Sequence, residues 1–281
     1  MSASSAPPSS GGRGTFSVAA WNIRCGRGNG LTFAAKGLAK MGVGCAILSE
    51  MKITDDRYAR MTSGYKVLST KAPSKHQGGI ALLWQPEHAG FEVEATKIVT
   101  PNLITFQLVT GDERYYVMGI YIPPNDAGGG DDLRAAWEAC PTNCSPIVMG
   151  DLNINVEHPR DEREAALADL LDEINLVDTS RKFNLRQCSF QKARKRWTWR
   201  QKRRGRWIYS QPDYIMARGD RIARLRKVGF RSPPIHDSDH RAVVAHIWKG
   251  RDGSLKTYRR NRQRFPITLP PGEQDEMTRQ F

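Results

Sequence analysis

The sequence lacks long hydrophobic runs and is poor in cysteine. A membrane-spanning helix needs about 18 consecutive apolar residues, and no such run occurs. Residues 1–14 contain neither the cationic nor the apolar region of a secretory signal peptide. The five cysteines are odd in number and form no CxxC pair, which argues against a disulfide framework and against a zinc ribbon. We therefore expect a soluble, intracellular protein without membrane contact.

Acidic residues are scarce relative to basic ones. Lys and Arg total 43 against 29 Asp and Glu, so the formal net charge is +14. No acidic residue occurs between Asp178 and Asp213, and this interval is crowded with cations and tryptophans. The positive charges of such a block repel one another unless a polyanion lies against them, so we predict a surface that binds nucleic acid. The predicted contacts are Lys192, Arg196, Trp199, Lys202, Arg203, Arg204, Arg206 and Trp207. The alternative for the tryptophans is a place in the core.

Composition divides the chain into three parts. Residues 1–14 are rich in Ser, Pro and Gly and are predicted to form a disordered leader. Residues 15–248 carry the apolar strand and helix patterns of a globular domain. That pattern stops after Trp248, and residues 249–281 are basic and then Pro-rich, which predicts a linker or tail.

Strand patterns outnumber helix patterns in the central part. Strands are predicted at 15–22, 43–50, 78–84, 103–109, 114–121, 146–149, 197–200, 212–217 and 241–248, and helices at 31–42 and 161–176. The second helix carries Ala166, Leu170, Leu171 and Ile174 on one stripe, as expected outside a sheet. Many short strands with few helices predict an α/β protein built on more than one sheet.

Polar side chains occur where the apolar runs stop. Asn22, Glu50, Tyr121 and Asp151 end their runs, whereas Asp239 and His240 precede the last one. Because ligand crevices lie at the strand ends of open sheets, these residues are expected to meet in one pocket. This requires that the last strand run antiparallel to the others, in a mixed sheet.

The residue types at these ends suit phosphodiester hydrolysis. Glu50 and Asp239 offer the oxygen ligands that Mg²⁺ prefers. Asp151 and His240 could position water and stabilise charge on the phosphate, with Asn22 and Asn153 holding that phosphate in register.

Six motifs in order carry a family resemblance: WNIR (21–24), LSE (48–50), GIY (119–121), GDLN (150–153), PDYI (212–215) and SDHRAV (238–243). Together they resemble the endonuclease/exonuclease/phosphatase family, and within it the apurinic-like endonuclease domain of non-LTR retrotransposons, over residues 16–248. The resemblance implies a DNase I-like, four-layer sandwich of two packed mixed β-sheets flanked by helices. It also implies Mg²⁺-dependent cleavage of phosphodiesters, with Mn²⁺ as a substitute.

The resemblance also assigns roles. It implies that Glu50, Asn22 and Asp239 hold the metal, and that the catalytic residues are Asp151, His240, Asp213, Asn153 and Tyr121. Asp151 resembles the residue that orients or deprotonates water, His240 the one on the scissile phosphate, and Asp213 its carboxylate partner. Arg24 stands where DNA-repair members often have an Asp, which favours one metal ion over two.

The function implied by the resemblance is nicking of one strand of double-stranded DNA. The 3′-hydroxyl then primes reverse transcription, which implies a reverse transcriptase domain in the same polyprotein. A monomer working in the nucleus is expected. The alternatives are an abasic-site repair endonuclease, an RNA deadenylase, and a catalytically dead nucleic-acid-binding module. Retention of the polar set argues against the dead module.

Overall fold

The computed structural model describes residues 15–55, 57–61, 63–86, 90–126, 128–184, 196–221, 225–233 and 238–248. The predicted leader, the predicted tail and Lys192 lie outside these residues. In the described part of the chain, no helix is long and apolar enough to cross a membrane.

The described strands form two large mixed sheets and one hairpin. The first sheet has the order β14 (Leu225–Arg231), β15 (Ala242–Trp248), β1 (Thr15–Asn22), β2 (Cys45–Ser49), β5 (Ile80–Trp84), β4 (Lys66–Ser69) and β3 (Arg57–Arg60). The second has the order β10 (Leu176–Asp178), β13 (Asp213–Arg218), β9 (Ser145–Asp151), β8 (Glu113–Tyr121), β7 (Leu103–Thr110) and β6 (Glu92–Thr100). The hairpin consists of β11 (Trp199–Arg203) and β12 (Arg206–Ser210).

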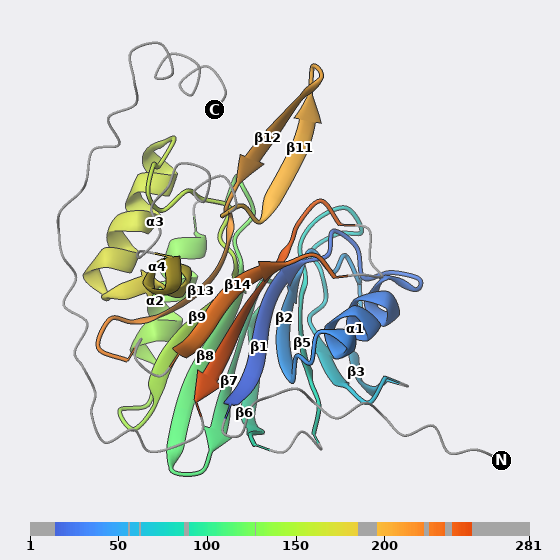
Figure 1. Cartoon of the computed structure of the whole chain (residues 1–281), viewed down its shortest axis with the longest axis vertical. Helices are drawn as coiled ribbons and strands as arrows, with labels where there is room; N and C mark the ends of the chain where they lie inside the picture. Colours follow the sequence, from blue (N-terminus) through green and yellow to red (C-terminus); the bar gives the residue numbers. More distant parts are fainter. Residues whose placement is uncertain are drawn as a thin grey trace.

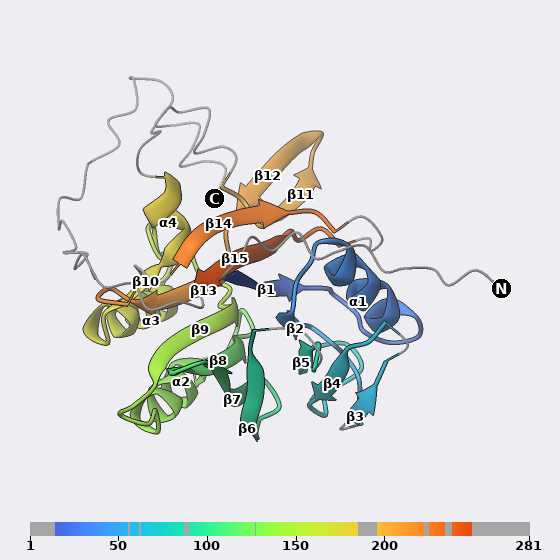
Figure 2. The ribbon, with the colours of Figure 1, turned by 60° about the horizontal axis from the view of Figure 1, so that its bottom comes forward.

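Helices cover the outer faces of the two sheets. They are α1 (Gly30–Lys40), α2 (Gly129–Glu138), α3 (Glu162–Glu173) and the short α4 (Thr179–Asn184). Figures 1 and 2 show α1 on one side of the paired sheets and α2 and α3 on the other. Buried side chains from both sheets, such as Ile47 and Phe106, form the core between them. The predicted four-layer sandwich is confirmed.

Each sheet mixes parallel and antiparallel pairs. In the first, β1 is parallel to β2 and antiparallel to β15. In the second, β8 is parallel to β9, and β13 is antiparallel to β9. The prediction that the last strand runs against the others is therefore correct. Because of this arrangement, the end of β1 and the segment that leads into β15 lie at the same edge.

Each predicted strand is present, with shifted ends, but several elements had no clear sequence signal. β6 is an edge strand with a largely exposed surface, so it lacks the apolar alternation by which strands are detected. The helix at 161–176 is α3, although its buried stripe differs from the prediction. Ala166 is exposed, and Leu167 packs inward with Leu170 and Leu171 instead.

Gly150 allows β9 to lie close to β8 just before Asp151. Its φ is +150°, and a Cβ added there would lie 1.7 Å from the carbonyl oxygen of Ile120. No side chain fits in that space, so only glycine permits this approach. The parallel register pairs Tyr121 with Asp151, and the antiparallel register on the other side pairs Asp213 with Asp151. The sheet thereby brings three polar residues to one edge.

Candidate active site

One amide joins two carboxylates at the centre of the site. Asn22, at the end of β1, donates from Nδ2 to Glu50 Oε1 at 2.9 Å and to Asp151 Oδ2 at 2.8 Å. Its own Oδ1 accepts the backbone N–H of Arg24 at 2.8 Å. Asn22 and Asp151 are fully buried. The two carboxylates therefore point into the same small space, one from each side of the amide.

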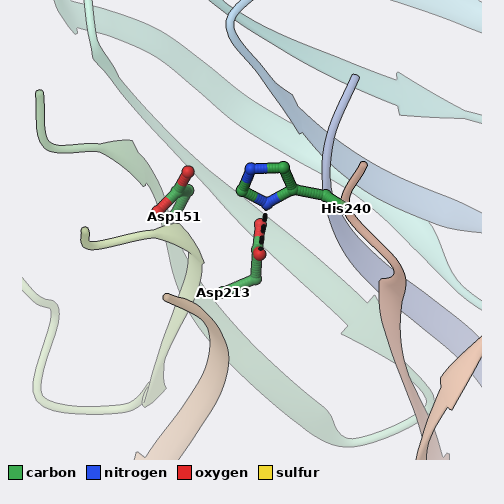
Figure 3. Close-up of side chains that lie close together, drawn as sticks. All are labelled: Asp151, Asp213 and His240. Atoms are coloured by element: carbon green, nitrogen blue, oxygen red, sulfur yellow. Dashed lines mark hydrogen bonds and ion pairs between the residues drawn. The ribbon is translucent and has the colours of Figure 1, made fainter. Parts of the chain in front are cut away.

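A histidine–aspartate pair lies beside them. His240 Nδ1 is 2.8 Å from Asp213 Oδ2, and both side chains are buried (Figure 3). The Asp213 backbone N–H donates to Thr198 Oγ1 at 3.2 Å, and the His240 backbone N–H donates to Ser238 Oγ at 3.1 Å. These bonds fix the imidazole against the carboxylate. Ligand atoms of Asp151, Asp213 and His240 all lie within 4.8 Å of one another.

Burial and mutual charge shift the protonation of this group. Burial, with the negative charge of Asp213, raises the pKa of Asp151 to about 7, although the charge of His240 opposes this. Burial alone would lower the pKa of His240, but the charge and hydrogen bond of Asp213, followed by the charges of Asp151 and Asp239, raise it to about 9. At pH 8 the ionised carboxylate and the charged imidazole therefore coexist.

Tyr121 and Asn153 complete the same edge. The Tyr121 hydroxyl lies near the side chains of Glu50 and Asn153, and burial, followed by the negative charges of Glu50 and Asp151, raises its pKa well above the usual range. Asn153 donates from its backbone N–H to Asp151 Oδ1 and from Nδ2 to the carbonyl of Ile122, both at 2.9 Å. The phenol is thus neutral and available as a donor.

Each of the two remaining predicted metal ligands lies beside a cation of the chain. Lys52 Nζ is 2.7 Å from Glu50 Oε2. Arg24 Nε is 3.5 Å from Asp239 Oδ1, and Trp199 Nε1 donates to Asp239 Oδ2 at 3.2 Å. Burial would raise the pKa of Glu50, but hydrogen bonds from Lys52 and Asn22 hold it below its usual value. Glu50 is therefore an anion at neutral pH.

Non-glycine residues in the left-handed region mark the same edge. Arg24, Glu50, Lys52 and Asn153 have φ values of 61°, 55°, 54° and 49°. Each such residue costs on the order of 1 kcal/mol, so it persists only where neighbouring bonds enforce it. Here Arg163 Nη2 donates to the carbonyl oxygen of Asn153 at 2.9 Å, and the backbone N–H of Lys52 donates to the carbonyl oxygen of Gly78 at 3.0 Å. The strained positions hold the side chains of the candidate site in place.

The donor set fits a hard divalent cation. Asp213 Oδ1 and Asp239 Oδ1 are buried oxygens that accept no hydrogen bond from the residues described. Carboxylate and amide oxygens of this kind are the ligands that Mg²⁺ takes. The buried cluster of Asp151, Asp213 and His240 could itself hold a metal ion. A charged imidazole cannot ligate, however, so Glu50 and Asp239 are the more suitable ligands at neutral pH.

The hairpin of β11 and β12 carries most of the predicted basic surface. It projects beyond both sheets (Figure 1), and Trp207 is 48% exposed on it. The predicted contacts Lys202, Arg203, Arg204 and Arg206 are exposed there as well. Arg196 differs, because it lies 3.6 Å from the buried Asp178 with its side chain only 24% exposed. Trp199 is half-buried against Asp239. The two tryptophans thus occupy different environments.

The hairpin is tied to the site through its backbone. The backbone carbonyl of Thr198 accepts a hydrogen bond from the backbone N–H of Arg241 at 2.6 Å, and the backbone N–H of Arg200 donates to the backbone carbonyl of Asp239 at 3.1 Å. The Arg200 guanidinium lies 4.8 Å from the Trp207 ring and 5.4 Å from the Trp197 ring. Sequence reasoning recognised the cations but not this connection to the segment that carries His240.

Solved structures with similar folds belong to nucleases. The endonuclease domain of TRAS1, a telomere-specific non-LTR retrotransposon, superposes with a TM-score of 0.61 at 16% identity, covering 83% of this chain and 98% of its own. An AP endonuclease from Leishmania major gives 0.65 at 13% identity, with coverages of 84% and 89%. One from Archaeoglobus fulgidus gives 0.64 at 16% identity, with coverages of 84% and 100%. The fold is DNase I-like. No family model and no curated protein sequence matches the chain.

Several residues of the site were missed by sequence reasoning. In the sequence, Lys52 and Arg163 cannot be distinguished from ordinary surface cations. Their contacts with Glu50 and Asn153 depend on the backbone geometry and not on a recognisable sequence spacing. Ser238 had a usable signal, since a serine two residues before a functional histidine can bond its backbone N–H.

The Asp213 side chain should control the protonation of His240. In the wild-type protein the imidazole should titrate near pH 9. In Asp213→Asn the charge is lost and burial dominates, so the His240 pKa should fall to about 6.5 or below. Long-range ¹H–¹⁵N NMR of the imidazoles measures both values. His246, whose pKa burial and Lys227 already lower, is the internal reference and should not move. An unchanged His240 titration would refute this electrostatic account.

Proposed function

We propose that this protein is a metal-dependent phosphodiester hydrolase that nicks double-stranded DNA. The observation that carries the proposal is the buried Asp151 carboxylate, which lies between the Asn22–Glu50 contact and the Asp213–His240 pair. A neutral-pH base, an imidazolium and two carboxylates suited to a metal ion, gathered at one edge of the sheets, suit the hydrolysis of a phosphodiester.

The side chains divide the chemistry between them. Asp151, once deprotonated, orients the attacking water and accepts its proton. His240, held charged by Asp213, donates to the phosphate oxygen on which negative charge develops. Tyr121 and Asn153 supply neutral donors that keep the phosphate in register. Because these groups are fixed before substrate arrives, little reorganisation is needed during reaction.

The metal is assigned to Glu50 and Asp239, with Asn22 orienting Glu50. When bound, Mg²⁺, or Mn²⁺ in its place, would neutralise charge on the phosphate and the leaving oxygen. Two observations support this assignment: Asp239 Oδ1 accepts no hydrogen bond from the described residues, with only the Arg24 ion pair beside it, and Glu50 is an anion.

We further propose that the nick serves target-primed reverse transcription. The support is the motif order in the sequence and the structural likeness to a retrotransposon endonuclease domain. In this proposal the 3′-hydroxyl primes a reverse transcriptase domain of the same polyprotein, and the endonuclease acts as a monomer in the nucleus. Other solved structures of this fold are AP endonucleases, so repair at abasic sites is the competing function that must be tested.

Loss of Asp151 or His240 function should abolish nicking without abolishing DNA binding. Asp151→Asn and His240→Ala each remove one member of a unit, so the rate should fall by at least about a thousandfold. The assay is conversion of supercoiled plasmid to open circle with Mg²⁺, with EDTA as the metal-free arm, beside a binding isotherm for each variant. The proposal fails if either variant nicks at close to the wild-type rate.

The same preparation distinguishes the competing functions. A duplex with one abasic site, an intact duplex and a polyadenylated RNA are compared at equal concentration. Faster cleavage of the intact duplex supports the proposed function. Preference for the abasic duplex or for RNA would reassign the substrate, and binding without cleavage of any substrate would leave a non-catalytic module.

The hairpin should hold DNA without taking part in the chemistry. Replacing Lys202, Arg203 and Arg204 together by Ala should weaken binding on every sequence and flatten the salt slope by roughly two to three units, at about 0.9 per phosphate contact. Trp207→Ala should instead change which steps are cut, because its exposed ring can contact bases without supporting the core.

A cleavage map of one long duplex and a thermal melt of each variant test this division. Arg134→Ala is the control for the loss of a positive charge, because Arg134 lies on α2, outside the hairpin, and pairs with Glu173 on α3. An unchanged salt slope in the triple variant would exclude the hairpin from DNA binding. A lower melting temperature of Trp207→Ala with an unchanged cleavage map would mean that Trp207 has a structural role. Trp199→Ala, in contrast, is expected to lower stability, because the Trp199 side chain donates a hydrogen bond to Asp239.

A further inference from the structure

The two carboxylates assigned to the metal are each neutralised by a cation from the same chain. Lys52 Nζ is 2.7 Å from Glu50 Oε2, and Arg24 Nε is 3.5 Å from Asp239 Oδ1. In the free protein these side chains occupy the positions of positive charge that a divalent cation would take. Metal binding must therefore displace or repel both.

The backbone places one cation just beyond the end of each of two neighbouring strands. Arg24 follows Asn22 by two residues at the end of β1, and Lys52 follows Glu50 by two residues at the end of β2. The strands are adjacent and parallel, with Asn22 paired to Ser49. Both cations have left-handed φ, 61° and 54°. The two segments differ in length, since Arg24 lies two residues beyond Asn22 and Lys52 lies three residues beyond Ser49, but each delivers one cation to the rim.

The two cations differ in how strongly they oppose a metal. The Lys52 side chain is 18% exposed, whereas that of Arg24 is 59% exposed. Charge interactions are screened less at partly buried positions, so Lys52 should account for most of the effect. Both side chains are long and end near the surface. They can therefore turn from a carboxylate to another anion without unfolding the turn that carries them.

We propose that Lys52 and Arg24 couple metal binding to DNA binding. In the free protein, Glu50 and Asp239 pair with these cations. When a divalent cation binds, the two carboxylates exchange Lys52 and Arg24 for it, and the released side chains pair with phosphates of the DNA backbone. Bound metal frees the two cations to pair with phosphates, and bound DNA draws the cations away from the metal-binding carboxylates. Each ligand therefore raises the affinity of the protein for the other by the same factor. The inference rests on the proposed function, because it takes metal and DNA as the ligands.

The coupling should be visible in binding alone. Mn²⁺ is titrated into the 281-residue protein, with free Mn²⁺ measured by electron paramagnetic resonance, in the presence and absence of a short phosphorothioate duplex that resists hydrolysis. In the wild-type protein the duplex should tighten Mn²⁺ binding by roughly tenfold. The reciprocal titration, duplex binding with and without Mn²⁺, should give the same factor.

Variants at the two cations identify the cause. Lys52→Met should bind Mn²⁺ several-fold more tightly than the wild type without DNA, because the competing charge is gone, and should retain little of the coupling. Arg24→Met should behave in the same direction with a smaller change. Arg134→Met is the matched control, since it removes a cation 2.7 Å from Glu173, a carboxylate outside the site, and should leave Mn²⁺ binding unchanged.

Two results would overturn the inference while leaving the proposed function intact. One is Mn²⁺ affinity that does not respond to DNA in the wild-type protein. The other is weaker Mn²⁺ binding in Lys52→Met, which would make Lys52 a support for Glu50 rather than a competitor of the metal. Absence of Mn²⁺ binding in every variant would instead refute the metal site of the proposed function, and the coupling with it.

Discussion

The hydrogen bond from Asn22 to Asp151 crosses from one sheet to the other, and the rest of the site depends on it. Asn22 ends β1 in the first sheet, and Asp151 ends β9 in the second. The contact of His240 with Asp213 crosses the same seam from the start of β15 to the start of β13. Two buried polar bonds therefore hold the sheet edges in register, and burial strengthens each while making its loss costly.

In the proposed function, the residues that carry the chemistry are separate from those that bind the substrate. The buried carboxylates carry the negative charge and shift the protonation of His240. Basic side chains lie outside, with a cluster of them exposed on the projecting hairpin, where they can meet a polyanion without disturbing the buried groups. Backbone bonds from Thr198 and Arg200 to the segment around Asp239 join the two parts. In the proposed function, the hairpin would hold the phosphate backbone at a fixed distance from the buried side chains of the site.

The strand ends could be predicted from sequence because apolar runs and the polar residues that end them are local signals. Glu50, Asp151 and His240 were found in this way, and their proximity followed from the mixed sheet. The pairing of Lys52 with Glu50 could not be predicted, since it depends on left-handed backbone at both residues. Neither could the burial of Leu167 in place of Ala166, which depends on how α3 meets the sheet. The edge strand β6 lacked any buried face to mark it.

In the proposed function an ionised Asp151 and a protonated His240 act together, so both groups should be visible in the pH dependence of single-turnover nicking at saturating metal. Asp151 must lose its proton, so the rate should fall as pH drops through about 7. His240 must keep its proton, so the rate should also fall as pH rises through about 9. This joint action predicts a bell-shaped pH profile with its maximum between these values, and its alkaline side should move to lower pH in Asp213→Asn. A rate that continues to rise above pH 9, or that does not change with pH, would contradict it.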